Sequence, residues 1–325
     1  MFAYIVRRLL QSTVVLAVMS LAVFAGVYAI GNPVDILINP QAGQQEIARA
    51  TAALGLDKPL AEQYFVFLRH AAAGDLGNSF AFNVPAIGLI LERMPATLEL
   101  ATAAMLIAMI LGIPLGLWAG LKPGSAAGKS IMAGSILGFS LPTFWVGLML
   151  IMVFSVYFGW LPSAGRGPTA NFLGMQLSFL SLEGWRHLIL PAANLALFNL
   201  SLIVRLARAG TREAMRQDYV RFARAKGLTE IHVVGVHVLK NVLIPIVTVM
   251  GLEFGSVIAF AVVTESIFAW PGMGKLLLDS INLLDRPVIV AYLCIVVTLF
   301  VLINFAVDVI CSWLDPRMRL VDSQA

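Results

Sequence analysis

The sequence predicts an all-α membrane protein, a bundle of helices whose chain crosses the bilayer six times. Composition is one reason, because 59% of the 325 residues are hydrophobic and only 12% are charged, whereas a soluble domain carries about 25% charged residues. The apolar runs are the other reason, since a helix that spans a bilayer needs about 20 mostly apolar residues. One soluble core could not hide so much apolar surface, so we expect lipid to be the solvent.

Six apolar runs have the necessary length. The expected spans cover residues 9–30, 96–121, 131–160, 188–206, 242–268 and 288–314. The second run carries Gly112, Gly116 and Gly120 at a spacing of four, which lets a second helix approach closely. We favour packing within the chain over a dimer contact at these glycines. Pro142 lies inside the third run and can kink its helix.

Basic residues predict the orientation of the chain. If the N-terminus is placed in the cytoplasm, most of the 22 lysines and arginines fall in cytoplasmic segments, as the positive-inside rule requires. Residues 31–94 then form an extracytoplasmic segment, 207–241 a cytoplasmic loop and 315–325 a cytoplasmic tail, so both termini are cytoplasmic. These residues account for the pI near 9.2, and no nucleic-acid partner is needed to explain it.

The sequence shows no catalytic or metal-binding constellation. The four histidines, His70, His187, His232 and His237, are scattered and do not follow the spacing of a zinc site. Residues 124–130 resemble a phosphate-binding loop, but only three residues separate the first glycine from the Gly-Lys pair, and the loop requires four. We therefore expect neither an enzyme nor a cofactor bound by this chain.

The cytoplasmic loop 207–241 contains a predicted amphipathic helix. Its apolar residues are Met215, Tyr219, Phe222 and Ala223, its basic residues are Arg216, Arg221 and Arg224, and Gly227 follows. The apolar spacing is that of one helix face, and a glycine is a common helix terminator. Such a helix can lie on acidic lipid or dock a cytoplasmic partner, and these residues alone favour lipid.

Polar residues at membrane depth are candidates for a transport pathway. Glu253 in the fifth run is the strongest, followed by Asn194 and Asn199 in the fourth, although hydrogen bonding between helices would explain them equally well. The residues Trp270, Pro271 and Gly272 form a turn between the last two runs. We expect this turn at the outer mouth of a pathway, with a plain interfacial anchor as the alternative.

Several stretches of the chain, in order, resemble permeases of ABC importers, and most narrowly the peptide/nickel branch. They are residues 54–60, 74–79, 95–100, 218–228 with His237, Asn241 and Pro245, then 265–272 and 315–317. The resemblance extends, in order, along nearly the whole chain. The general Glu-Ala-Ala motif before the loop glycine is matched only at Ala223 and Gly227, so no glutamate role carries over.

The resemblance implies the transmembrane fold of a type I importer, with residues 95–314 as its core and 1–30 as an additional first helix. It implies ATP-driven import of dipeptides, oligopeptides or a similar small solute across the bacterial inner membrane. Nickel chelates, glutathione, opines and sugars are alternative substrates.

The implied partners are two ABC ATPase subunits that bind ATP and Mg²⁺, a second related permease and an extracytoplasmic binding protein. The helix at 215–227 would couple to the ATPases. An ion-coupled secondary transporter is the rival class, but it typically shows an internal repeat, and none is visible in the sequence.

Overall fold

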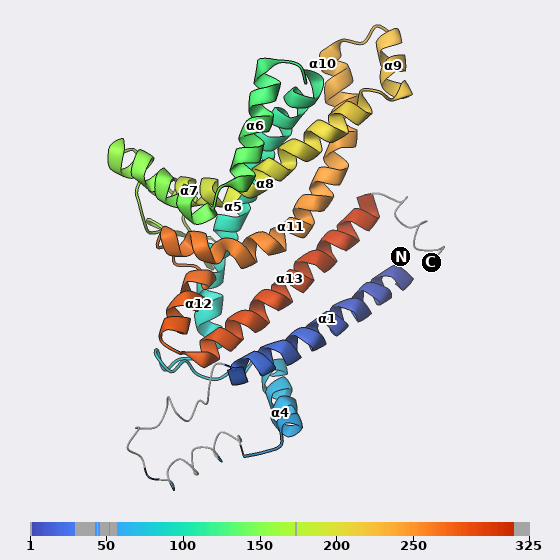
Figure 1. Cartoon of the computed structure of the whole chain (residues 1–325). Coiled ribbons are helices and arrows are strands. Elements are labelled where there is room, and N and C mark those ends of the chain that lie inside the picture. The colour runs from blue at the N-terminus through green and yellow to red at the C-terminus, as the bar shows by residue number, and fades with distance from the viewer. Residues whose placement is uncertain are drawn as a thin grey trace. The chain divides into compact units, whose positions relative to one another are not determined.

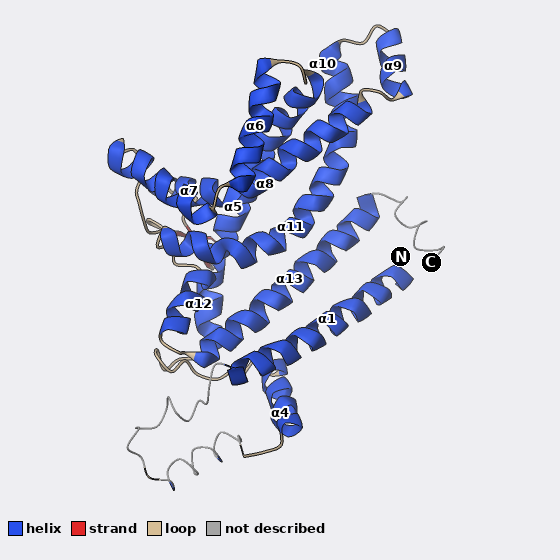
Figure 2. Cartoon of the chain, in the orientation of Figure 1, coloured by secondary structure: helices blue, strands red, loops and turns tan. Residues whose placement is uncertain are grey.

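The computed structural model describes residues 2–29, 57–172 and 174–314, together with positions 43, 45 and 52 (Figure 1). The described chain is almost entirely helical (Figure 2), which confirms the predicted all-α class. Most of residues 30–56 of the predicted exterior segment, and the whole predicted tail 315–325, lie outside the described residues. The chain divides into two compact units, one of Met1–Met94 with Lys275–Ala325 and one of Pro95–Gly274.

The first unit is built around two long helices. Its elements are α1 (Phe2–Ala29), α4 (Leu60–Ala72), the first turns of α5 (Ala86–Leu121), most of α12 (Met273–Asn282) and α13 (Arg286–Leu314). Helices α1 and α13 run antiparallel (Figure 1), and Arg8 Nη2 lies 3.1 Å from Asp308 Oδ1. The start of α1 and the end of α13 therefore lie at the same end of the pair, as two cytoplasmic termini would require.

The second unit contains the remaining helices and a short hairpin. Its elements are most of α5, then α6 (Ala126–Ser140), α7 (Thr143–Leu150), the π-helix η1 (Ile151–Tyr157), β1 (Ala170–Phe172), β2 (Met175–Leu177), α8 (Leu182–Ala214), α9 (Asp218–Ala225), α10 (Glu230–His232), the π-helix η2 (Val233–Val238) and α11 (Leu239–Ile267). The two strands pair antiparallel, with Ala170 opposite Leu177. Helix α8 is the centre of this unit, because α6, α7 and α11 all pack against it.

The three glycines of α5 lie in contact with α8. A Cβ on Gly112 would come within 2.8 Å of Ile203, and a Cβ on Gly120 within 2.7 Å of Thr211; Gly116 faces Ala207 between them. The predicted packing within the chain is confirmed at all three. Because the contacts advance in the same order along both helices, α5 and α8 run parallel, and the chain must travel back between them.

The returning segment is not the single helix that the sequence predicts over residues 131–160. Helices α6 and α7–η1 meet at a bend of 109°, so these residues do not form one continuous helix, and the kink predicted at Pro142 is present. Leu141 at the bend is extended, with ψ 135°, because a residue that precedes a proline avoids helical backbone, and Pro142 itself has no N–H to donate.

Five described helical segments are long and apolar enough to cross a membrane. They are Val6–Gly26, Ala86–Leu121, Leu182–Ala214, Glu230–Ile267 and Arg286–Val309. The bent pair of α6 and α7–η1 makes a sixth if it crosses as one span. Five of the six predicted runs therefore correspond to continuous helices in the described chain.

Candidate functional site

The predicted loop helix is present, but it starts later than the sequence pattern indicates. Helix α8 continues to Ala214, and the N–H of Met215 still donates to Thr211 O at 3.0 Å. Gln217 is then extended, with ψ 149°, and α9 begins at Asp218. Met215 and Arg216 therefore belong to the turn between α8 and α9, because the hydrogen bonding of α8 runs on through Met215.

The end of α9 is where the sequence predicts it. Gly227 has φ +80°, its N–H donates to Arg224 O at 2.9 Å, and the N–H of Leu228 donates to Ala223 O at 3.4 Å. These two bonds form the Schellman motif, which needs a residue of left-handed conformation where glycine carries no Cβ penalty. The predicted helix stop at Gly227 is confirmed.

The apolar residues of α9 point in two directions rather than one. Val220 and Ala223 are buried and pack toward η2, whereas Tyr219 is 39% exposed and Phe222 is 62% exposed. The single apolar face predicted from the spacing is therefore wrong for Ala223, which faces the molecule. Phe222 is the large apolar side chain that α9 leaves outward, and the amine of Lys226 lies 4.6 Å from its ring.

Two polar contacts fasten α9 to the helices that follow it. Asn241 Nδ2 donates to the Tyr219 hydroxyl at 3.1 Å, and Arg224 donates through Nε and Nη2 to Glu230 at 2.8 and 3.0 Å. The Arg221 guanidinium pairs with Asp218 of the same helix, with Nη1 3.4 Å from Oδ1. These contacts connect α9 to α10 and to the first turn of α11.

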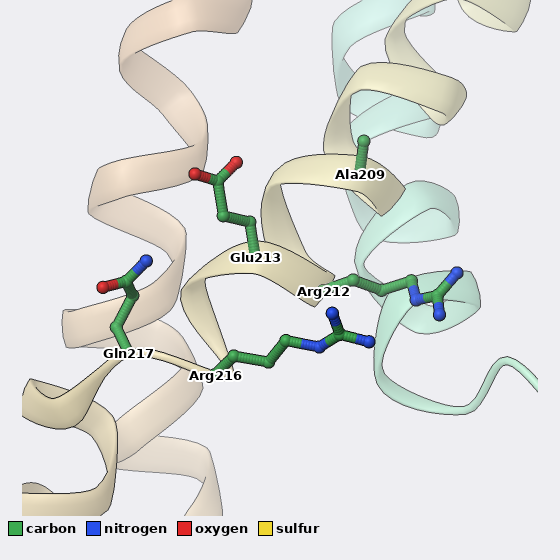
Figure 3. Close-up of a pocket in the computed structure, with 5 residues that line it drawn as sticks. All are labelled: Ala209, Arg212, Glu213, Arg216 and Gln217. Carbon is green, nitrogen blue, oxygen red and sulfur yellow. The ribbon is translucent and has the colours of Figure 1, made fainter.

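A polar hollow lies beside this region at the end of α8. Its volume is about 420 Å³, and it is lined by Ala209, Arg212, Glu213, Arg216 and Gln217. Figure 3 shows the Arg212 and Arg216 side chains extending to one side of α8 and Glu213 to the other. Arg212 and Arg216 give this hollow a cationic rim near the start of α9. Among the described residues, no group of three or more His, Cys, Asp or Glu side chains is placed to hold a metal ion.

The three predicted pathway residues occupy different environments. Asn194 is buried, and its Nδ2 donates to Thr264 Oγ1 at 3.0 Å, which joins α8 to α11. Asn199 is buried as well, and Glu253 is half-buried on α11. Within the described chain no hydrogen bond joins any two of the three. Asn194 thus makes a hydrogen bond between two helices, which was the alternative explanation for these polar residues.

The turn at residues 270–272 is part of the core of the second unit. Trp270 is completely buried, and its Nε1 donates to Ala96 O at 2.8 Å. A buried indole N–H requires such an acceptor. Gly272 is buried too, and Pro271 is half-buried. The location of this turn at the outer mouth of a pathway stays a prediction.

The sequence analysis missed the polar cluster that holds this turn. Thr97 donates its hydroxyl to Glu265 Oε1 at 2.6 Å and accepts the N–H of Met273 at 2.8 Å. The Glu265 carboxylate fills the space that a Cβ on Gly272 would occupy. Glycine is therefore required at that position because a buried carboxylate takes the place of a side chain.

A second buried carboxylate ties the hairpin segment to α5. Glu99 Oε1 accepts the backbone N–H groups of Ser178 and Phe179, both at 2.8 Å, and the Ser178 hydroxyl at 2.7 Å. Its other oxygen pairs with Arg166, whose Nε lies at 3.0 Å. The only sequence signal was the clustering of Thr97 and Glu99 within residues 95–100, a stretch that carries the family resemblance.

Comparison with known proteins agrees with the fold and covers nearly the whole chain. Residues 112–320 match the family of binding-protein-dependent transport system inner membrane components, and residues 1–101 match the N-terminal component of the same systems. The di/tripeptide transport system permease protein DppB of Pseudomonas aeruginosa is 42% identical over 335 residues, which cover 98% of this chain and 99% of that protein.

Two further relatives cover 98% of this chain and 99% of their own length. The dipeptide transport system permease protein DppB of Escherichia coli K12 is 37% identical over 336 residues. The glutathione transport system permease protein GsiC of the same strain is 36% identical over 320 residues.

A solved structure supports the fold independently of sequence identity. A chain of the MetNI methionine ABC transporter, in inward-facing conformations, superposes with a TM-score of 0.55 at 17% identity, over 70% of this chain and 96% of that chain. This likeness agrees with the fold of an ABC importer transmembrane subunit. The chain therefore belongs to the family of binding-protein-dependent transport system inner membrane components, and it is a multi-pass permease of a bacterial ABC importer, not an enzyme.

Proposed function

We propose that this permease imports short peptides and that α9 is the element through which ATPase subunits drive it. The observation that carries the proposal is the outward Phe222 on a helix whose opposite face is buried and which is fastened to α10 and α11. A side chain presented in this way can enter a groove on a partner, and the fastening transmits the resulting force.

The proposed mechanism starts with ATP and Mg²⁺ bound in two ABC ATPase subunits. Closure of those subunits would displace α9, and Tyr219 and Arg224 would carry the displacement to Asn241 and Glu230. Helix α11 would then shift against α8, to which it is joined at Asn194. Such a shift alternates the access of a central path, with Glu253 and Asn199 as its candidate lining.

The basic residues around α9 fit a partner with acidic side chains. Arg212, Arg216 and Arg221 reach solvent near Phe222, and Arg212 and Arg216 form the rim of the polar hollow (Figure 3). Charges at the rim of an interface mainly steer association and fix its register. We therefore assign attachment of the ATPase to Phe222 and Tyr219, and assign orientation to the arginines.

Short peptides are the substrate class that the relatives support. Two of them are named for dipeptides or di/tripeptides and one for glutathione, which is itself a tripeptide. We further propose a second homologous permease as the partner across the pathway and an extracytoplasmic solute-binding protein as the donor of substrate. Lipid surrounds the spans.

Uptake by the complete transporter in proteoliposomes tests this function. With the binding protein, both permeases and the ATPases present, we expect ATP-dependent uptake of a radiolabelled dipeptide, unchanged when ionophores collapse ion gradients. Unlabelled di- and tripeptides should compete, and a nickel chelate should not. Uptake that ionophores abolish, or that only the nickel chelate inhibits, would contradict the proposal.

A further inference from the structure

We propose that α4 is an interfacial helix that inserts one apolar edge into the lipid leaflet at the C-terminal end of α1. None of the 13 residues of α4 is buried. On that edge, the Phe65 side chain is 69% exposed. An amphipathic helix with this much uncovered apolar surface needs an apolar surrounding.

The residues of α4 divide into three faces when each is placed 100° after the last. The face toward α1 carries Tyr64 and Phe67, the apolar edge carries Ala61, Phe65, Leu68 and Ala72, and the polar face carries Glu62, Arg69, His70 and Gln63. One exposed valine, Val66, interrupts the polar face, which is ordinary for a surface. The apolar edge therefore adjoins the α1 contact on one side and water-facing residues on the other.

Contacts with α1 fix the depth of α4. The Tyr64 and Ser20 hydroxyls are 2.8 Å apart, and the ring of Phe24 lies 5.3 Å from that of Tyr64 and 5.9 Å from that of Phe67. Helix α1 continues to Ala29. At 1.5 Å per residue, Phe24 and Ser20 lie about 8 and 14 Å before that residue. Helix α4 is thus held near the C-terminal end of α1.

Continuity with the surface of α1 identifies lipid as the occupant. Little of the α1 span is buried, and Val14, Val18 and Leu21 project from it with most of their surface uncovered. In a membrane span such side chains face acyl chains. Figure 1 shows α4 set across the C-terminal end of this helix, so we infer that its apolar edge meets the same lipid.

The chemistry of α4 fits this position. Interfacial helices sink their apolar face about 5–10 Å below the headgroups, and Phe24, whose ring contacts Tyr64, lies about 8 Å from the end of α1. Arg69 lies beside Phe65 on the helix surface, where a long basic side chain can reach a lipid phosphate while its stem stays on apolar surface. Helix α4 would then anchor the segment between the first and second spans to the bilayer.

Spin labels at matched positions test the proposal. In the complete transporter in lipid nanodiscs, on a background of Cys294→Ala and Cys311→Ala, single labels replace Phe65→Cys, Ala72→Cys and, as the control, His70→Cys. Phe65 and His70 are about 140° apart on the helix. Power saturation then compares collisions with oxygen, which concentrates in lipid, and with a water-soluble nickel chelate.

We expect the ratio of oxygen to nickel collisions to be several-fold higher at positions 65 and 72 than at position 70. A nickel accessibility at 65 equal to that at 70 would place the edge in water and overturn the proposal. Exclusion of both reagents at 65 and 72 would mean that protein covers the edge, which overturns it equally. The three positions are exposed and on one helix, so labelling does not disturb the fold.

Discussion

Tyr219 on α9 and Asn241 in the first turn of α11 are joined by a hydrogen bond of 3.1 Å across 22 residues of sequence. Asn241 also donates to His237 O at 2.7 Å, so its amide is held by the start of the long helix while it holds the tyrosine. The bond connects the outward helix of the cytoplasmic loop directly to a membrane-spanning helix. The coupling account depends on this connection.

Removal of this hydrogen bond should loosen coupling without preventing assembly. Tyr219→Phe keeps the ring and deletes the hydroxyl, which costs about 1 kcal/mol, or a factor of about five in an equilibrium. We expect fewer peptides imported per ATP hydrolysed, with the permease still bound to its ATPases. Asn241→Leu, which offers the hydroxyl neither a donor nor an acceptor, should give the same phenotype. An unchanged ratio in both variants would refute the role of the bond.

A side chain at Gly227 should weaken the end of α9. Its φ of +80° makes a Cβ unfavourable, so Gly227→Ala should cost about 1 kcal/mol although nothing crowds the site. Gly235→Ala is the matched control, because that glycine lies in η2 with open space and no positive φ. We expect faster proteolysis of the loop after α9 in the first variant alone. Equal cleavage of both would contradict the cap.

Bulk at the contact between α5 and α8 should destabilise the second unit. A Cβ on Gly116 falls against Ala207 and the backbone of Val204, so Gly116→Leu should lower the melting temperature in detergent by several degrees. Gly134→Leu on α6, where a Cβ meets nothing within 4 Å, controls for the change in volume. A similar loss in both variants would mean that the glycine contact is not the cause.

Removal of one partner of the buried ion pair between Glu99 and Arg166 should destabilise the second unit. The Glu99 side chain is almost fully buried and accepts five hydrogen bonds from Ser178, Phe179 and Arg166. Arg166→Met should destabilise the unit by about 3–5 kcal/mol, because it leaves an uncompensated carboxylate. Thermal unfolding of the single and double variants measures this.

In that comparison, Glu99→Gln with Arg166→Met should recover part of the loss, since the amide oxygen can still accept from Ser178. A double variant that is less stable than either single one would show that the two residues do not act together.

Much of the fold follows from local properties of the sequence. The length of the apolar runs predicts the spans, and Gly227 predicts the end of α9, because both depend on nearby residues alone. Pro142 predicts a kink in the third run, but the sequence does not predict that the bend reaches 109°. The sequence did not predict the buried face of α9. Val220 and Phe222 are both apolar, and periodicity alone does not show that Val220 is buried while Phe222 is exposed.

The buried carboxylates could not be predicted for a different reason. Glu99 pairs with Arg166, 67 residues away, and Glu265 with Thr97, 168 residues away. No pattern within either segment predicts these partners. Residues 95–100 and 265–272 carry the family resemblance, yet their mutual contact through Thr97 appears only in the structure. The family resemblance thus identifies these two segments, and the structure shows that they contact each other.

The central claim is that Phe222 couples this permease to its ATPases. The most direct test measures peptide imported and ATP hydrolysed in the same proteoliposomes for Phe222→Ala, with Phe260→Ala as control, since that side chain is 75% exposed near the other end of α11. We predict at least a tenfold loss of uptake per ATP for Phe222→Ala and none for Phe260→Ala. A wild-type ratio in Phe222→Ala, with the complex intact, would contradict the account.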